Sequence, residues 1–168
     1  MAGAAGDLGA RITRALVARG ARVRALIRPD TVESDRDRLV GLGASLAPAD
    51  PNNVGPLATA IAGVDCVVSA LNGLREVILD RQSLLLDAAK ATGLRRFVFT
   101  GILASDQAPD VPHFLNKTRA EDYLTQIGVP YVSVRPGAYL DQVMVITPGG
   151  GPASGRLYSF GSPAVDMT

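Results

Sequence analysis

Apolar and polar positions along the chain alternate between two periodicities. Residues 7–19 repeat apolar side chains every three or four positions and end before Gly20, which predicts a helix closed by a glycine. Residues 22–27 (RVRALI) then read as a strand. The same pair recurs, with further helices expected at residues 31–40, 52–61, 75–91 and 112–127 and further strands at 45–47, 64–70, 96–100 and 130–135.

The alternation of strands and helices predicts how the sheet is built. The strand at residues 64–70 (VDCVVSA) is apolar almost throughout, as is typical of a strand buried on both faces of a parallel sheet. The pattern therefore predicts a three-layer, doubly wound α/β fold of the Rossmann type. After Pro136 it dissolves into glycine-rich sequence with a short strand expected at 156–160, so a single domain is expected over residues 1–168.

Composition narrows the classes of function. The chain has 17 Lys and Arg against 16 Asp and Glu, and this balance argues against a nucleic-acid partner. Neither a membrane-spanning stretch nor a signal peptide is recognised in the sequence. Cys66 is the only cysteine and suits a reducing compartment, so a cytoplasmic protein is expected. The chain has one cysteine and one histidine, too few for a metal site, so none is expected.

The first residues of the chain have the spacing of a dinucleotide-binding loop. Small residues allow a backbone to approach a pyrophosphate, and a following helix offers N–H groups and a positive dipole end. The alternative is chance, because the chain has 18 glycines. The helix and strand that follow favour the cofactor loop. Its expected binding residues are Gly3, Ala5, Gly6, Asp7, Leu8 and Gly9.

The end of the strand at 22–27 bears on the choice between cofactors. Arg28 comes directly after it, and Asp30 follows two residues later. A guanidinium at this position accommodates the 2′-phosphate of NADP, whereas a carboxylate would repel it. The sequence therefore predicts NADP(H) over NAD(H), the alternative being that Arg28 is an ordinary surface arginine.

The order and spacing of these motifs resemble those of a known family, the NmrA-like or isoflavone-reductase-like atypical short-chain dehydrogenases. The stretches that carry the resemblance are GAAGDLGARI, VRALIRP, GVDCVVSALNGLREVILDRQSLLLDAAKATGLRRFVFTG, HFLNKTRAEDYL and VPYVSVRPGAYLD. The resemblance implies a Rossmann sheet that binds NADP(H), with Gly3, Gly6, Gly9 and Arg28 on the family's cofactor positions. Members include NADPH-dependent reductases of aromatic or quinone substrates, and also proteins that bind the cofactor and report redox state.

A second motif concerns the chemistry. Typical short-chain dehydrogenases carry Tyr-x-x-x-Lys on one helical face, and the matching string here begins with His113 and ends with Lys117. Lys117 could pair with Glu121 or hold the cofactor ribose, and either His113 or Lys117 could act as a general acid for a reduced carbonyl. The resemblance favours a functional Lys117. Residues at the ends of two strands are expected to line the cofactor site by position alone: Ala70, Leu71, Asn72 and Thr100.

The position of the glycine loop in the chain raises a problem. The first strand of a doubly wound sheet is central, yet only Met1 and Ala2 precede the loop. Its absence would leave both neighbouring strands unpaired, so we expect an upstream coding start, a fragment, or another segment in the slot. The family also continues past residue 168 with elements that build the substrate pocket. Residues 136–168 are therefore expected to be a loop-rich remnant of the substrate-side region.

Together these features predict an NADPH-dependent oxidoreductase that transfers hydride to a small carbonyl, enone or quinone substrate. The alternative is a non-catalytic NADP(H)-binding sensor or regulator that acts through a protein partner; a homodimer is also considered. A third interpretation is a truncated product without activity.

Overall fold

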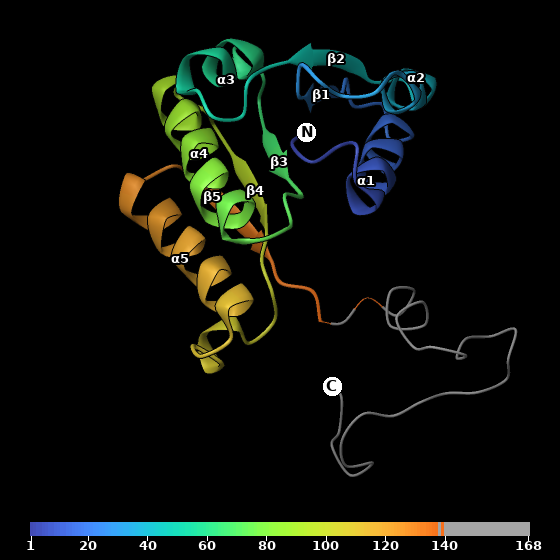
Figure 1. Ribbon diagram of the computed structural model, residues 1–168. Helices are drawn as coiled ribbons and strands as arrows, with labels where there is room; N and C mark the ends of the chain where they lie inside the picture. Colours follow the sequence, from blue (N-terminus) through green and yellow to red (C-terminus); the bar gives the residue numbers. More distant parts are fainter. Residues whose placement is uncertain (138, 140–168) are drawn as a thin grey trace, which may run out of the picture. The chain divides into compact units, whose positions relative to one another are not determined.

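Parallel strands form the centre of the unit that spans Met1–Arg135. The structure is a computed structural model that describes residues 1–137 and 139 (Figure 1). One group of strands is β1 (Arg24–Ile27) and β2 (Ser45–Pro48), which pair in parallel. The other is β3 (Val67–Ser69), β4 (Phe97–Thr100) and β5 (Tyr131–Val134), paired in that order and also parallel.

Met1 and Ala2 connect the two groups of strands. The amide of Leu26 in β1 donates to the Met1 carbonyl at 2.9 Å. On the other side, the Ala2 amide donates to the Val68 carbonyl at 2.8 Å, and its carbonyl accepts from the Ala70 amide at 3.0 Å. The resulting spatial order is β2, β1, residues 1–2, β3, β4, β5. A two-residue segment therefore occupies the slot in which a central strand was expected.

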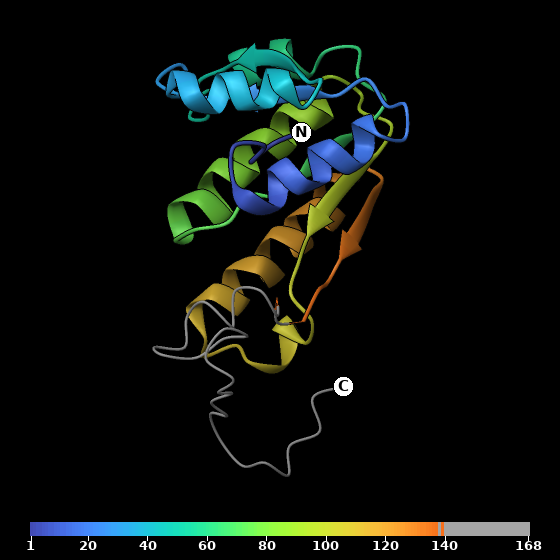
Figure 2. The same cartoon turned by 90° about the vertical axis from the view of Figure 1, so that its right-hand side faces the viewer.

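The helices flank this sheet on two sides. Helices α1 (Asp7–Val17) and α2 (Glu33–Gly41) lie on one side, and α3 (Val54–Ile61), α4 (Gln82–Ala91) and α5 (Pro112–Ile127) lie on the other (Figures 1 and 2). A π-helical segment, η1 (Glu76–Arg81), leads into α4, and a short 3₁₀ turn, η2 (Ser105–Gln107), precedes α5. This arrangement confirms the predicted doubly wound α/β fold.

Two apolar clusters correspond to the two sides of the sheet. The larger cluster contains Phe97 and Phe99 of β4 together with Leu86 of α4 and Leu124 of α5, all fully buried. Side chains alternate along a strand, so the neighbours Val98 and Thr100 face away from α4 and α5. The smaller cluster lies under α1 and α2 and consists of Ala4, Val23, Ala25, Ile27, Leu39 and Ala44.

The elements differ from the sequence expectation mainly at their ends. The helix expected at 75–91 is an α-helix only from Gln82 onward, and its first turns, Glu76–Arg81, are π-helical instead. The helix expected at 112–127 has those bounds and ends at Gly128 in a left-handed conformation (φ +72°). The strand expected at 156–160 and almost all of the region 136–168 lie outside the described residues.

Candidate cofactor site

The glycine loop turns directly from Ala2 into helix α1. Gly3 has φ +74°, which L side chains rarely adopt, and its carbonyl accepts from the Gly6 amide at 3.1 Å. Helix α1 begins at Asp7, and Gly6 precedes it without a side-chain cap. The backbone N–H groups at the start of this helix therefore point out of its first turn toward the carboxyl ends of the strands.

Close packing explains two of the three glycines. A Cβ on Gly9 would lie 1.9 Å from the Gly3 carbonyl oxygen, which no side chain can tolerate. A Cβ on Gly3 would lie 2.8 Å from the Ala70 carbonyl oxygen. A Cβ on Gly6 would meet only an ordinary contact at 3.4 Å, so packing within the protein does not require this glycine. Gly6 is thus the one of the three glycines whose open side leaves room for a pyrophosphate to approach the backbone.

A cavity of about 400 Å³ opens beside this loop at the carboxyl ends of β1 and β3. Ligands bind at such a point in doubly wound sheets, where the strand order reverses. One wall is the glycine loop and the ends of β1 and β3, and the other is the segment after β2 together with η1 and α4. Its lining includes Gly3, Ala5, Gly6, Arg28, Asp30, Asp35, Ala49, Pro51, Leu57, Leu71, Asn72, Val77, Arg81 and Leu85.

Arg28 is the cation at the β1 end of this cavity. Its Nε lies 3.2 Å from the Asp30 carboxylate, and both side chains are exposed. Exposed ion pairs contribute at most about 1 kcal/mol, so the guanidinium can exchange this partner for a ligand phosphate at small cost. Arg28 thus lies where the sequence predicts the 2′-phosphate contact.

Arg38 braces the glycine loop from helix α2. Its Nη2 donates to the Ala5 carbonyl at 2.6 Å and to the Asp35 carboxylate at 2.7 Å. Because the Ala5 carbonyl is engaged in this bond, it is turned toward α2 rather than left as a bare acceptor in an anion site. Arg38 could not be identified from the sequence, since Ala5 lies on a different element.

Lys117 is buried beside the ends of β3 and β4. Its ammonium donates to the Leu71 carbonyl at 3.1 Å and to the Thr100 carbonyl at 2.8 Å, and it lies 5.0 Å from the centre of the Phe99 ring. Burial lowers the pKa of Lys117 to about 8, with a smaller opposing effect from the charge of Glu121. Lys117 therefore loses its proton at a lower pH than an exposed lysine does.

The sequence alternative that pairs Lys117 with Glu121 does not describe the main contacts of either residue. The Glu121 carboxylate accepts hydrogen bonds from Ser133 Oγ and from Arg135, and it forms an ion pair with the Arg135 guanidinium. These partners lie on and just after β5, so Glu121 fastens α5 to that strand. Lys117 instead ties α5 to the ends of the two neighbouring strands.

His113 lies one helical turn before Lys117 and is partly buried. Burial and the charge of Lys117 lower the pKa of His113, and a hydrogen bond with the Gly73 backbone opposes this shift. The lowered pKa favours the neutral imidazole, whose bond with Gly73 links α5 to the loop after β3.

The predicted site residues fall into groups. Six of them line the one cavity: Gly3, Ala5, Gly6, Arg28, Leu71 and Asn72. Gly9 and Ala70 pack against Gly3, and Thr100 donates its hydroxyl to the Ser69 carbonyl at 3.0 Å, so these three support the lining residues. Asp7 pairs with Arg11 one turn along α1, and Leu8 is half-buried beside it. Lys117 and His113 lie apart from the cavity lining, on α5.

Arg81 is a cavity residue that the sequence analysis missed. Val77, Arg81 and Leu85 all line the cavity, and they are spaced four residues apart. This i, i+4, i+8 row is a signal in the sequence, but it resembles the apolar face of any buried helix. Only the charge of Arg81 distinguishes this row from the apolar face of an ordinary buried helix.

Neither a metal centre nor a membrane-spanning helix is found in the part of the chain that the structure describes. Within residues 1–137 and 139, no group of three or more histidine, cysteine or acidic side chains is placed to hold a metal ion. None of the helices found there has the length and apolar character needed to cross a membrane.

Comparison with known proteins identifies the family. Residues 1–165 match the NmrA-like family, and the chain belongs to it. It is 31% identical over 136 residues to photosystem II assembly factor Ycf39 of Cyanophora paradoxa, covering 77% of this chain and 41% of that protein. The chain spans about half or less of the length of the relatives and solved structures it matches.

Solved structures show the same fold. An NADPH-dependent quinone oxidoreductase from Escherichia coli in complex with NADPH is 22% identical with a TM-score of 0.73, covering 88% of this chain and 52% of that chain. AtPrR2 with NADP⁺ and (+)-pinoresinol is 26% identical with a TM-score of 0.70, covering 82% of this chain and 49% of that one. The resemblance inferred from the sequence motifs is therefore confirmed.

Proposed function

We propose that this member of the NmrA-like family binds NADP(H) in preference to NAD(H) and serves hydride transfer from NADPH to a small carbonyl, enone or quinone. The observation that carries the proposal is one cavity lined by the glycine loop at one wall and by Arg28 at the end of β1. The NADP⁺ bound to the 26% identical AtPrR2 supports it.

Each element of the cavity takes a part of the cofactor in this proposal. The N–H groups in the first turn of α1, at Asp7 and Leu8, receive the pyrophosphate. Arg28 receives the 2′-phosphate in a charge-assisted, bidentate contact. The backbone from Ala70 to Asn72 follows the ribose and nicotinamide along the end of β3. Bound NADPH supplies the hydride, and the protein orients it.

Lys117 is the proposed proton donor. Reduction of a carbonyl or quinone leaves a negatively charged oxygen that needs a proton. With a pKa of about 8, the Lys117 ammonium is mostly protonated at neutral pH and releases its proton more readily than an exposed lysine. His113 orients the loop after β3 through its contact with Gly73.

Cofactor preference is tested by titrating NADPH and NADH into the wild type, Arg28→Ala and Arg22→Ala. Arg22 is exposed just before the start of β1 and serves as the matched control. The wild type should bind NADPH more tightly, and Arg28→Ala should lose about tenfold or more of that affinity while NADH binding barely changes. Equal affinities for the two cofactors in the wild type would contradict the proposed preference.

Turnover is tested by following NADPH oxidation with quinone, enone and aromatic carbonyl substrates. We expect oxidation with at least one class, its loss in Lys117→Met, and its retention in His113→Ala. Full activity of Lys117→Met would contradict the proposed role of Lys117 as the proton donor.

A regulator without turnover is the second candidate. The similarity to an assembly factor favours it, as does the engagement of the Lys117 ammonium with two backbone carbonyls. Such a protein would bind NADPH and signal through a protein partner or a second copy of the chain. Tight NADPH binding with no oxidation in any substrate class would support this candidate over the enzyme.

A further inference from the structure

The cavity holds a second arginine whose surroundings differ from those of Arg28. Arg81, at the end of η1, lines the wall formed by the helix and by the segment after β2. Its side chain is 22% exposed, against 58% for Arg28. The two cations are therefore placed for different tasks in the same cavity.

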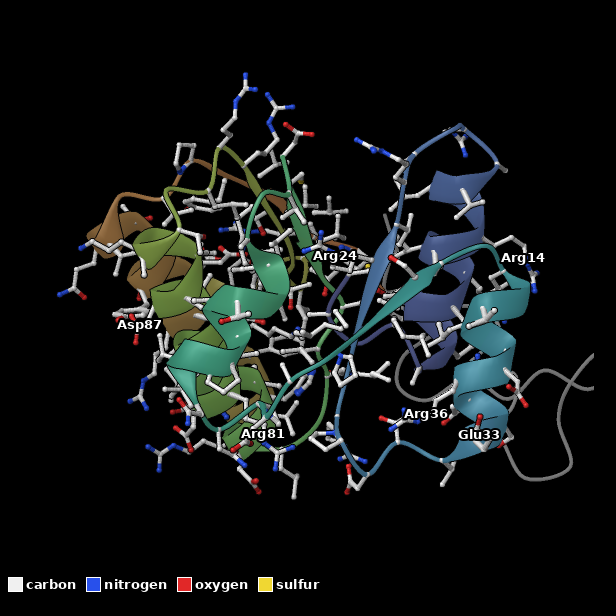
Figure 3. The ribbon with its side chains drawn as sticks, turned by 90° about the horizontal axis from the view of Figure 1, so that it is seen from above. Arg14, Arg24, Glu33, Arg36, Arg81 and Asp87 are labelled. Atoms are coloured by element: carbon white, nitrogen blue, oxygen red, sulfur yellow. The ribbon has the colours of Figure 1, made fainter. Side chains whose placement is uncertain are left out.

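The charge and orientation of Arg81 are already fixed within the protein. Its Nη2 donates to Glu76 Oε1 at 2.5 Å, and its Nε donates to Asn52 Oδ1 at 3.3 Å. Asn52 is held in turn, because its backbone amide donates to the Asp50 carboxylate at 2.9 Å. In Figure 3, Arg81 lies next to the segment that leads from β2 to α3. A neutralised and fixed guanidinium is a poor phosphate clamp but a good planar surface.

The other residues that line this wall of the cavity are apolar. Pro51 and Leu57 lie on the segment after β2 and on α3, and Val77 and Leu85 flank Arg81 in the row along the helix. Val77 and Arg81 lie in η1, and π-helical turns are frequent at functional sites. An apolar wall with one planar cation suits a flat aromatic ring.

We propose that Arg81 stacks on the adenine of NADP(H) and is a cofactor-binding residue of this chain. The proposal rests on the proposed function, since it takes the 2′-phosphate to lie at Arg28. The adenosine ribose carries both that phosphate and the base. The base therefore lies within a few ångströms of Arg28, and the apolar wall with Arg81 is the lining there that can receive a ring.

A stacking role and a phosphate-binding role of Arg81 predict different effects of substitutions at this position. Arg81→Lys keeps the positive charge and the pairing with Glu76, but it removes the planar group. Arg81→Gln removes the charge and keeps a planar amide. A stacking role predicts that glutamine preserves more affinity than lysine, whereas a phosphate-binding role predicts the reverse.

The experiment is a titration of NADPH and NADH, by cofactor fluorescence, into the wild type, Arg81→Ala, Arg81→Lys, Arg81→Gln and Arg75→Ala. Arg75 is the matched control, because it precedes the same helix, pairs with Asp80 at 3.9 Å and lies outside the cavity lining. We expect Arg81→Ala and Arg81→Lys to weaken both cofactors about tenfold with an unchanged NADPH-to-NADH ratio. Thermal unfolding curves show whether each variant is folded. If Arg81→Ala is not folded, Arg81→Gln is compared with the wild type in its place.

Three outcomes overturn the proposal while leaving the proposed function intact. These are unchanged affinity in Arg81→Ala, rescue by lysine, and a loss confined to NADPH. Failure of the wild type to bind either cofactor would instead overturn the proposed function, and the role of Arg81 with it.

Discussion

Lys117 is a buried lysine whose ammonium is held by two backbone carbonyls. Its ammonium bonds to carbonyls that lie 46 and 17 residues away, and its side chain is nearly inaccessible to solvent. A buried charge costs stability unless it is well paired, and here the hydrogen bonds to two carbonyls replace hydration. Lys117 thus fixes the ends of β3 and β4 with a group that titrates near neutral pH.

This burial makes stability depend on pH in a defined direction. Below pH 8, Lys117 is charged in both folded and unfolded states, and the cost of burial is fully present. As pH rises from about 8 toward 10.5, the folded state loses its proton first, so the free energy of unfolding should rise relative to Lys117→Met. The rise is bounded at about 3 kcal/mol. Urea unfolding of the wild type and of Lys117→Met between pH 7 and 9.5 measures this rise. A difference in the free energy of unfolding that stays constant over this pH range would contradict the prediction.

The glycine loop and α1 show how one element sets up the candidate site. Helix α1 can begin beside the cavity only because Gly9 packs against the Gly3 carbonyl without a side chain. The loop is then held by the Arg38 brace from α2 and by the contact of Gly3 with Ala70. The position of the N–H groups that are proposed to bind pyrophosphate follows from these contacts.

Gly9→Ala tests this dependence. The added methyl group would lie 1.9 Å from the Gly3 oxygen, so the loop must separate from the helix. We expect a loss of about 2 kcal/mol or more in the free energy of unfolding, as for other overpacked sites, and the loss of NADPH binding. Gly41→Ala at the end of α2 is the control, because no atom lies within 4 Å of its added Cβ. A Gly9→Ala variant as stable as this control would show that the packing is not constraining.

The elements were predictable from the sequence where one periodicity dominated. Helix α5 has the predicted bounds because Pro112 begins it and Gly128 ends it, both through local backbone preferences. The π-helical turns of η1 were not predictable, since one extra residue in a turn leaves the apolar pattern almost unchanged. Strands such as β3 are shorter than their apolar runs, because a strand ends where its partners stop pairing.

The candidate site was predictable only in part for a similar reason. Gly3, Gly9 and Arg28 carry a spacing that reflects local geometry, so the sequence pointed to them. Arg38 gains its place from a contact with Ala5, which lies 33 residues away and which no spacing encodes. Arg81 shares its spacing with the apolar face of any buried helix, so its contact with Asn52 could not be predicted either.

At the scale of the whole unit, the two sets of strands and their two apolar clusters meet at Met1 and Ala2. The hydrogen bonds of these residues to β1 and β3 place the glycine loop at the point where the strand order reverses. The cavity, both arginines and the start of α1 gather there because the topology brings the carboxyl ends of parallel strands to one edge. The central claim is that NADP(H) binds across this point.

A crystal structure of the chain grown with NADPH tests that claim most directly. The predicted result is a cofactor in the cavity, with its pyrophosphate against the first turn of α1, its 2′-phosphate at Arg28 and its adenine against Arg81. An empty cavity at saturating NADPH, or a cofactor bound elsewhere on the molecule, would contradict the account.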